Sequence, residues 1–135
     1  MCGIIGYPVD HSLSPVMHNA AFNELGIDFV YVPFRVAPRF LGVAVRALRH
    51  LEVLGFNVTV PHKTQIMRHL DRSDLLAKRI GAVNTVLNTE NELAGYNTDA
   101  VGAMEAMAHN HVEPNSSEFT ILGAGGAARA IVFAL

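Results

Sequence analysis

Cysteine is nearly absent from this chain of 135 residues, and charged residues are few. The one cysteine, Cys2, cannot form an internal disulfide, which fits the reducing cytoplasm. Charged residues make up 16% of the chain and the formal net charge is −2, so no basic field would attract nucleic acid. The chain also lacks a secretory signal and any apolar run of the roughly 18 residues that a membrane span needs. We therefore expect a soluble cytoplasmic domain with no nucleic-acid or membrane partner.

Hydrophobic residues, in contrast, make up 50% of the chain, which excludes a disordered protein. Apolar runs typical of strands alternate with helical periodicity, and this alternation predicts an α/β fold, a three-layer sandwich with a mostly parallel sheet. The expected strands cover residues 2–6, 28–34, 56–60, 82–88, 93–96 and 119–122, with 82–88 and 93–96 forming a hairpin. The expected helices cover residues 14–25, 40–54, 61–70, 73–80, 99–109 and 127–135.

Apolar residues follow helical periodicity in two of these helices. In the first helix Val16, Ala20, Phe22 and Leu25 fall on or near one face. In the helix over 40–54 the predicted inward stripe consists of Leu41, Val45, Leu48 and Leu51.

The polar stretch 111–117 is the one convincing linker in the chain. It divides a domain over 1–110 from a unit over 118–135, which consists of one strand, a glycine-rich turn and one helix. That last helix is apolar on nearly every face and has no following strand to pack beside, so we expect the chain to be truncated there. An exposed apolar unit of this kind also predicts a homodimer or other self-association.

The glycine-rich turn has the form Gly123-x-Gly125-x-x-Ala128, between a predicted strand and a predicted helix. Such a turn lets backbone N–H groups approach a pyrophosphate at the positive end of the helix, which predicts dinucleotide binding. The alternative is an ordinary tight turn between strand and helix. An acidic residue, or an arginine for NADP, belongs roughly 20 residues further on, past Leu135.

Hydroxyl groups occur two residues apart in Ser12-Leu13-Ser14-Pro15, at the predicted start of a helix. Both can face an anion at the helix N-terminus, and a carboxylate is the natural ligand. The alternative is that Ser14 only caps the helix and Ser12 is solvated.

Polar residues also interrupt three buried-looking segments. Alternation along 57–60 places Asn57 and Thr59 on one face of a strand, and Lys63 then falls in the first turn of the next helix. Asn84 lies in an apolar run, and Thr98-Asp99 opens the helix over 99–109, where either residue could act as a cap. For Lys63 alone, a solvated surface lysine is the alternative. Together these residues lie at strand ends and helix starts, where α/β proteins bind ligands.

The chain resembles the shikimate dehydrogenase family along essentially its whole length. The resemblance rests on five motifs in the family's order and spacing: HSLSP at 11–15, NVTVPHK at 57–63, GAVNT at 81–85, GYNTD at 95–99 and GAGGAAR at 123–129. It implies an N-terminal substrate domain followed by the first βα unit of a Rossmann domain. It also implies NADPH-dependent reduction of 3-dehydroshikimate to shikimate in aromatic amino-acid biosynthesis, with this truncated chain inactive alone.

The resemblance also implies roles for particular residues. Lys63 and Asp99 would form the catalytic pair beside the carbonyl that is reduced. Ser12 and Ser14 would hold the substrate carboxylate, and Thr59, Asn84 and Asp99 its ring hydroxyls. The NADP-binding residues would be Gly123, Ala124, Gly125, Gly126 and Ala127.

Three alternatives remain. Quinate dehydrogenases belong to the same family, although Ser14 favours shikimate. A non-catalytic binding module would retain the carboxylate site, although a pure binder does not need the Lys63 and Asp99 pair. A two-domain dehydrogenase acting on folate fits the serine pair less well. No metal site is expected, because the seven histidines show no ligand spacing, and Cys2 is expected to be strand packing.

Overall fold

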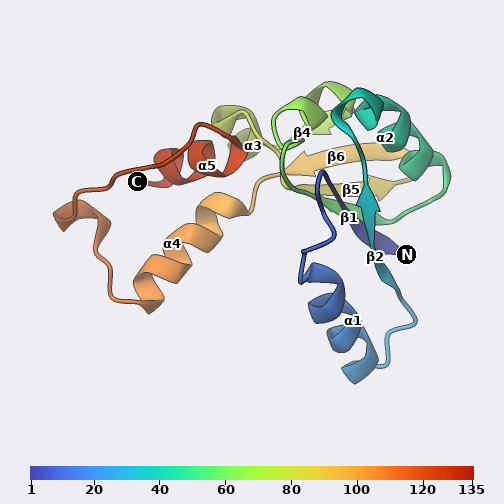
Figure 1. Cartoon of the computed structure of the whole chain (residues 1–135), viewed down its shortest axis with the longest axis horizontal. Helices are drawn as coiled ribbons and strands as arrows, with labels where there is room; N and C mark the ends of the chain where they lie inside the picture. Colours follow the sequence, from blue (N-terminus) through green and yellow to red (C-terminus); the bar gives the residue numbers. More distant parts are fainter.

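The computed structural model describes residues 1–135, with the side chain of Ser116 excepted. A six-stranded sheet in the order β2-β1-β3-β5-β6-β4 forms its centre (Figure 1). The strands are β1 (Cys2–Gly6), β2 (Tyr31–Arg35), β3 (Gly55–Val58), β4 (Arg72–Ser73), β5 (Thr85–Thr89) and β6 (Glu92–Tyr96). The pairs β1/β2, β1/β3 and β4/β6 are parallel, and the antiparallel pairs are those of β5 with β3 and with β6. The predicted α/β class, mostly parallel sheet and hairpin are confirmed.

Helices flank the sheet on both faces, with α1 and α2 on opposite sides (Figure 1). The α-helices are α1 (Ser14–Glu24), α2 (Leu41–His50), α3 (Leu75–Ile80), α4 (Asp99–His109) and α5 (Gly126–Ala134). Short 3-10 helices are η1 (Pro38–Phe40), η2 (Gln65–His69) and η3 (Pro114–Ser116). None of the described helices is both long and apolar enough to cross a lipid bilayer.

The main core lies between the sheet and α2. Successive strand residues face opposite sides, so Ile5, Phe56, Val58 and Val86 all point toward this helix, which contributes Leu41, Val45 and Leu48. The predicted stripe of α2 is therefore confirmed at those positions. It is wrong at Leu51, which is 68% exposed because the helix already ends at His50.

The opposite face of the sheet has a smaller cluster, made of Ile4, Val9 and Tyr31, with Cys2 and Phe22 packed against it. Cys2 is therefore strand packing, as expected. No residue of α1 is buried: Phe22 packs on this cluster, whereas Val16 and Leu25, expected near the same face, are 71% and 70% exposed. The helix packs beside the edge strand β2 and β1 instead of across the sheet, so it has little apolar surface to cover.

The C-terminal unit differs from the prediction in its strand. Residues 119–122 do not form a strand, and Leu122 is 93% exposed. Strand geometry depends on a hydrogen-bonded neighbour, and this segment lies outside the six-stranded sheet. Helix α5 does form, and it packs on α3 and α4 through Ala130, Ile80 and Ala100 (Figure 1).

The segment after Pro61 also differs from the prediction. The helix expected over 61–70 is only the 3-10 helix η2, and Lys63 lies in the turn that precedes it. The lysine therefore does not lie within the first turn of an α-helix. It lies where the chain leaves β3, close to the carboxyl end of that strand, which is the edge at which α/β folds place ligands.

Candidate functional site

Lys63 and Asp99 form an ion pair at this edge of the sheet. The distance from Lys63 Nζ to Asp99 Oδ2 is 2.6 Å, and the side chains are 17% and 22% exposed. Asp99 is the first residue of α4, where the positive end of the helix dipole stabilises its carboxylate. The pair is thus desolvated enough to be held firmly and exposed enough to contact a ligand.

Asn84 holds the same carboxylate from the other side. Its Nδ2 donates to Asp99 Oδ1 at 2.8 Å and to Thr98 Oγ1 at 2.8 Å. Its Oδ1 accepts from the Thr98 backbone N–H at 2.9 Å and from Thr85 Oγ1 at 3.1 Å. One carboxylate oxygen of Asp99 therefore faces an amide and the other an ammonium, so the orientation of the group is fixed.

Asn97 shapes the start of α4, and the sequence reasoning missed it. Its Oδ1 accepts from the Asp99 backbone N–H at 3.0 Å, and its Nδ2 donates to the Ala82 carbonyl at 3.0 Å. Thr98, one of the two predicted caps, makes no side-chain capping bond. The available signal was an asparagine two residues before the helix, a residue type that commonly bonds its own backbone two residues on.

The serine pair lies at the start of α1, and both residues are half-buried. Ser14 is the first helical residue, not the cap, and its backbone N–H donates to Ser12 Oγ at 3.3 Å. The hydroxyl of Ser14 also neighbours Tyr31: burial raises the pKa of Tyr31 to about 12, and the Ser14 hydroxyl opposes this rise. Carboxylate binding by the two serines stays a prediction.

The glycine-rich turn meets the lysine across a cavity of about 310 Å³. Thr59, Lys63 and neighbouring residues line one side of this cavity, and Gly125, Gly126 and Ala127 line the other. A Cβ on Gly126 would lie 2.5 Å from Lys63 Cβ, so only glycine allows this approach. One cavity is therefore bordered by Lys63, the predicted catalytic lysine, and by Thr59, which is predicted to bind a ring hydroxyl. Part of the loop that is predicted to bind the cofactor lies on its other side.

Gly123 and Ala124 do not line that cavity; they line another, beside Arg129. Gly123 has a φ of +112°, a conformation that favours glycine, so its role is in the turn itself.

The loop suits a phosphate group of a nucleotide cofactor. The start of α5 has no side-chain cap and no acidic residue in its first turn, so its backbone N–H groups are available. A Cβ on Gly125 would meet nothing within 4 Å, which leaves open space in front of the helix. These residues fit the pyrophosphate part of NADP.

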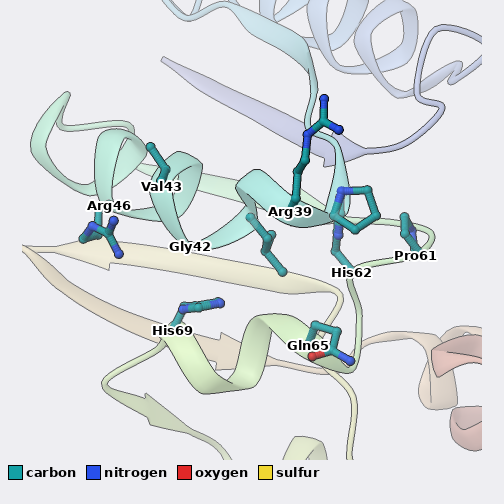
Figure 2. Close-up of a pocket in the computed structure, with 10 residues that line it drawn as sticks. Arg39, Gly42, Val43, Arg46, Pro61, His62, Gln65 and His69 are labelled. Carbon is teal, nitrogen blue, oxygen red and sulfur yellow. The ribbon is translucent and has the colours of Figure 1, made fainter.

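A larger cavity of about 540 Å³ lies between α2 and η2, and Pro61 lines both this cavity and the one beside Lys63 (Figure 2). Arg46, His62, Gln65 and His69 are among its lining residues, and no predicted site residue is. His62 is buried, and its Nε2 lies 2.7 Å from the Val36 carbonyl, so this histidine packs against the segment that follows β2. Among the described residues there is no cluster of three or more candidate metal ligands.

Comparison with known proteins gives consistent matches. The family model for the shikimate dehydrogenase substrate binding domain matches residues 4–86. A shikimate dehydrogenase (NADP(+)) of Bacillus cereus (strain AH187) is 53% identical over 134 residues, which are 98% of this chain and 48% of that protein. The shikimate dehydrogenase (NADP(+)) of Methanobrevibacter smithii is 50% identical over 133 residues, 98% of this chain and 46% of that protein.

The solved structures agree. The shikimate 5-dehydrogenase of Thermus thermophilus in complex with NADP(H) and shikimate is similar with a TM-score of 0.89 at 41% identity, over 98% of this chain and 50% of that one. The chain therefore spans about half the length of the curated relatives that it matches.

Proposed function

Because the chain belongs to the shikimate dehydrogenase family through its substrate-binding domain, we propose that it is the substrate-binding part of an NADP-dependent shikimate dehydrogenase. The reaction is the reversible reduction of 3-dehydroshikimate to shikimate in aromatic amino-acid biosynthesis. The observation that carries the proposal is the Lys63 and Asp99 ion pair, at 2.6 Å, beside the cavity that Lys63 shares with the glycine-rich turn.

The chemistry of a ketone reduction explains these residue types. NADPH, when bound, supplies the hydride that adds to the carbonyl carbon. The oxygen then gains negative charge, which the Lys63 ammonium stabilises before it donates the proton that completes the alcohol. Asp99 orients the lysine, because its Oδ2 accepts a charge-assisted hydrogen bond from Lys63 Nζ at 2.6 Å. In the reverse direction the neutral lysine accepts the proton of the alcohol.

The remaining predicted residues take the substrate's other groups. Ser12 and Ser14, at the N-terminus of α1, hold the carboxylate, which the helix dipole also attracts. Thr59, Asn84 and Asp99 hold ring hydroxyls. Four hydrogen bonds orient the Asn84 amide and engage both its protons and both lone pairs of its oxygen, so a ring hydroxyl would replace one of these bonds.

The division of the chain is part of the proposal. Residues 1–110 form the substrate domain, 111–117 the linker and 118–135 the start of the NADP-binding domain. The segment 119–122 supports this division, because it has the composition of a strand but pairs with none of the six strands of the sheet. A cytoplasmic location fits the single cysteine, and the exposed Leu122 and Val132 fit self-association.

Binding of shikimate tests the proposal directly. Calorimetry or NMR titration of the 135-residue chain should show saturable binding that is lost in the Ser12→Ala/Ser14→Ala double variant. A matched control is Ser73→Ala/Ser117→Ala, which removes two hydroxyls elsewhere and should leave the affinity unchanged. Lys63→Ala should weaken binding while retaining the fold.

Two further measurements separate the alternatives. Quinate binding tighter than shikimate binding would identify the quinate-type relative. Shikimate binding that Lys63→Ala leaves unchanged would favour the non-catalytic module, which does not need the Lys63 and Asp99 pair. A folded, monodisperse chain that binds neither acid would refute the proposal.

A further inference from the structure

A line of polar side chains crosses the sheet on the face that carries α1, and the proposed chemistry does not use most of it. Tyr31 lies on β2, Asn57 on β3 and Thr85 on β5, next to Asn84. The Tyr31 hydroxyl lies 2.7 Å from Asn57 Oδ1, and Asn57 Nδ2 lies 3.2 Å from Thr85 Oγ1. Thr85 and Asn57 are directly opposite each other in the β3/β5 pair.

The direction of each hydrogen bond follows from the donors available. The backbone N–H of Thr98 donates to Asn84 Oδ1, which fixes that atom as the amide oxygen. Thr85 must then donate its one proton to Asn84 Oδ1, and its oxygen accepts from Asn57 Nδ2. Asn57 Oδ1 in turn accepts from the Tyr31 hydroxyl.

All bonds of this line therefore point the same way, from Tyr31 toward the carboxylate of Asp99. The last bond is that from Asn84 Nδ2 to Asp99 Oδ1, at 2.8 Å. Hydrogen bonds that run in one direction and end on an anion polarise and strengthen each other. Tyr31 is 4% exposed and Asn84 9%, so each member depends on its partners to avoid an unpaired polar group.

We propose that Tyr31, Asn57 and Thr85 are positioning residues, whose hydrogen-bond line holds the Asn84 amide and, through it, the Asp99 carboxylate against Lys63. The line begins beside Ser14 at the proposed carboxylate site and ends at the catalytic pair. The inference rests on the proposed function for the identity of the ligand, but the hydrogen-bond line itself can be tested without one.

The ligand-free test compares Thr85→Val with Thr85→Ser. Valine keeps the branched shape of threonine and removes the hydroxyl, whereas serine keeps the hydroxyl. Hydrogen exchange of the Asn84 side-chain amide, followed by NMR in the full chain, should be about 5- to 10-fold faster in T85V, as expected for one lost hydrogen bond, and near wild type in T85S. Equal exchange in all three proteins would overturn the proposal, as would T85S behaving like T85V.

The tyrosine end has its own matched pair. Tyr31→Phe removes the hydroxyl that donates to Asn57, and Tyr7→Phe removes an exposed hydroxyl outside the line. The Asn57 side-chain amide should exchange faster in Y31F, with a smaller change at Asn84, and neither amide should change in Y7F. An unchanged Asn57 amide in Y31F would contradict the geometry.

Ligand binding distinguishes positioning from general loss of structure. Cyclohexenecarboxylate has the ring and carboxylate of shikimate but none of its hydroxyls, so it cannot use Asn84 or Asp99. T85V should weaken shikimate binding about 5- to 10-fold relative to T85S and leave cyclohexenecarboxylate binding unchanged. Equal weakening of both ligands would overturn the proposal. If the wild-type chain binds neither ligand, the proposed function fails, and the exchange measurements alone decide the positioning role.

Discussion

Replacing Asn97 with alanine is expected to destabilise the protein by about 2 to 4 kcal/mol, although the residue touches neither Lys63 nor a proposed ligand. The side chain is 4% exposed and bonds three backbone groups, the N–H groups of Asp99 and Ala100 and the carbonyl of Ala82. Loss of the capping bond to the Asp99 N–H costs about 1 kcal/mol. The Ala82 carbonyl, in a residue that is 0% exposed, then loses the amide donor of Asn97, which adds about 1 to 3 kcal/mol.

The assay is urea denaturation of the chain, followed by circular dichroism. Asn110→Ala is a matched control, since the Asn110 amide also donates to a backbone carbonyl, that of Ala106, but in an exposed position. Its cost should stay within about 0.5 kcal/mol, as for most surface substitutions. A cost of Asn97→Ala no larger than that of the control would refute the idea that Asn97 secures the junction between α4 and the segment after α3.

Two other substitutions test the site and the sheet. Gly126→Ala places a Cβ 2.5 Å from that of Lys63, so the lysine or α5 must move, and shikimate binding should weaken by at least severalfold. The control is Gly102→Ala, on α4 with open space around it. It should leave binding unchanged and stabilise the helix slightly, by about 0.5 to 1 kcal/mol. Unaltered binding in G126A would contradict the close packing. The Leu93 backbone N–H donates to Asp71 and holds the pKa of this carboxyl below its usual value. The ionised carboxylate therefore stabilises the folded protein at any pH above the pKa of Asp71 in the unfolded chain. This stability is lost as the pH falls through the lowered pKa of the folded protein. Denaturation of wild type and Asp71→Asn should therefore show a stability difference at neutral pH that disappears in acid, and a difference that persists in acid would argue against this linkage.

Local elements with a strong pattern could be predicted from the sequence. The helix predicted over 99–109 has those bounds in the structure, and the hairpin of β5 and β6 turns at Glu90 and Asn91, both with positive φ. The failures involve partners that no local pattern reveals. Helix α1 packs mainly against β2 and β1, at one end of its face of the sheet, so Val16 and Leu25 stay exposed, and 119–122 has strand composition without a neighbouring strand.

The candidate site was predictable as a set of residues but not as an arrangement. The motifs contained Lys63, Asn84 and Asp99, and the order of strands then brought them together, because β5 lies between the strands that precede Lys63 and Asp99. The sequence did contain a sign of the hydrogen-bond line, since Asn57 is a polar residue in a buried strand. Its partner Tyr31 is on a strand two positions away in the sheet, and no periodicity along the chain connects the two.

The ion pair of Lys63 and Asp99 joins residues 36 positions apart, and the chain between them contains β4, α3, β5 and β6. Those elements must be ordered before the two side chains meet, so the site cannot exist in a partly folded chain. A molecule that bridges the pair binds only the folded state, and at 100 times its Kd it adds about 2.7 kcal/mol to the free energy of unfolding. For a domain whose total stability is of the order of 5 to 15 kcal/mol, the concentration of that molecule then governs how much folded protein survives proteolysis.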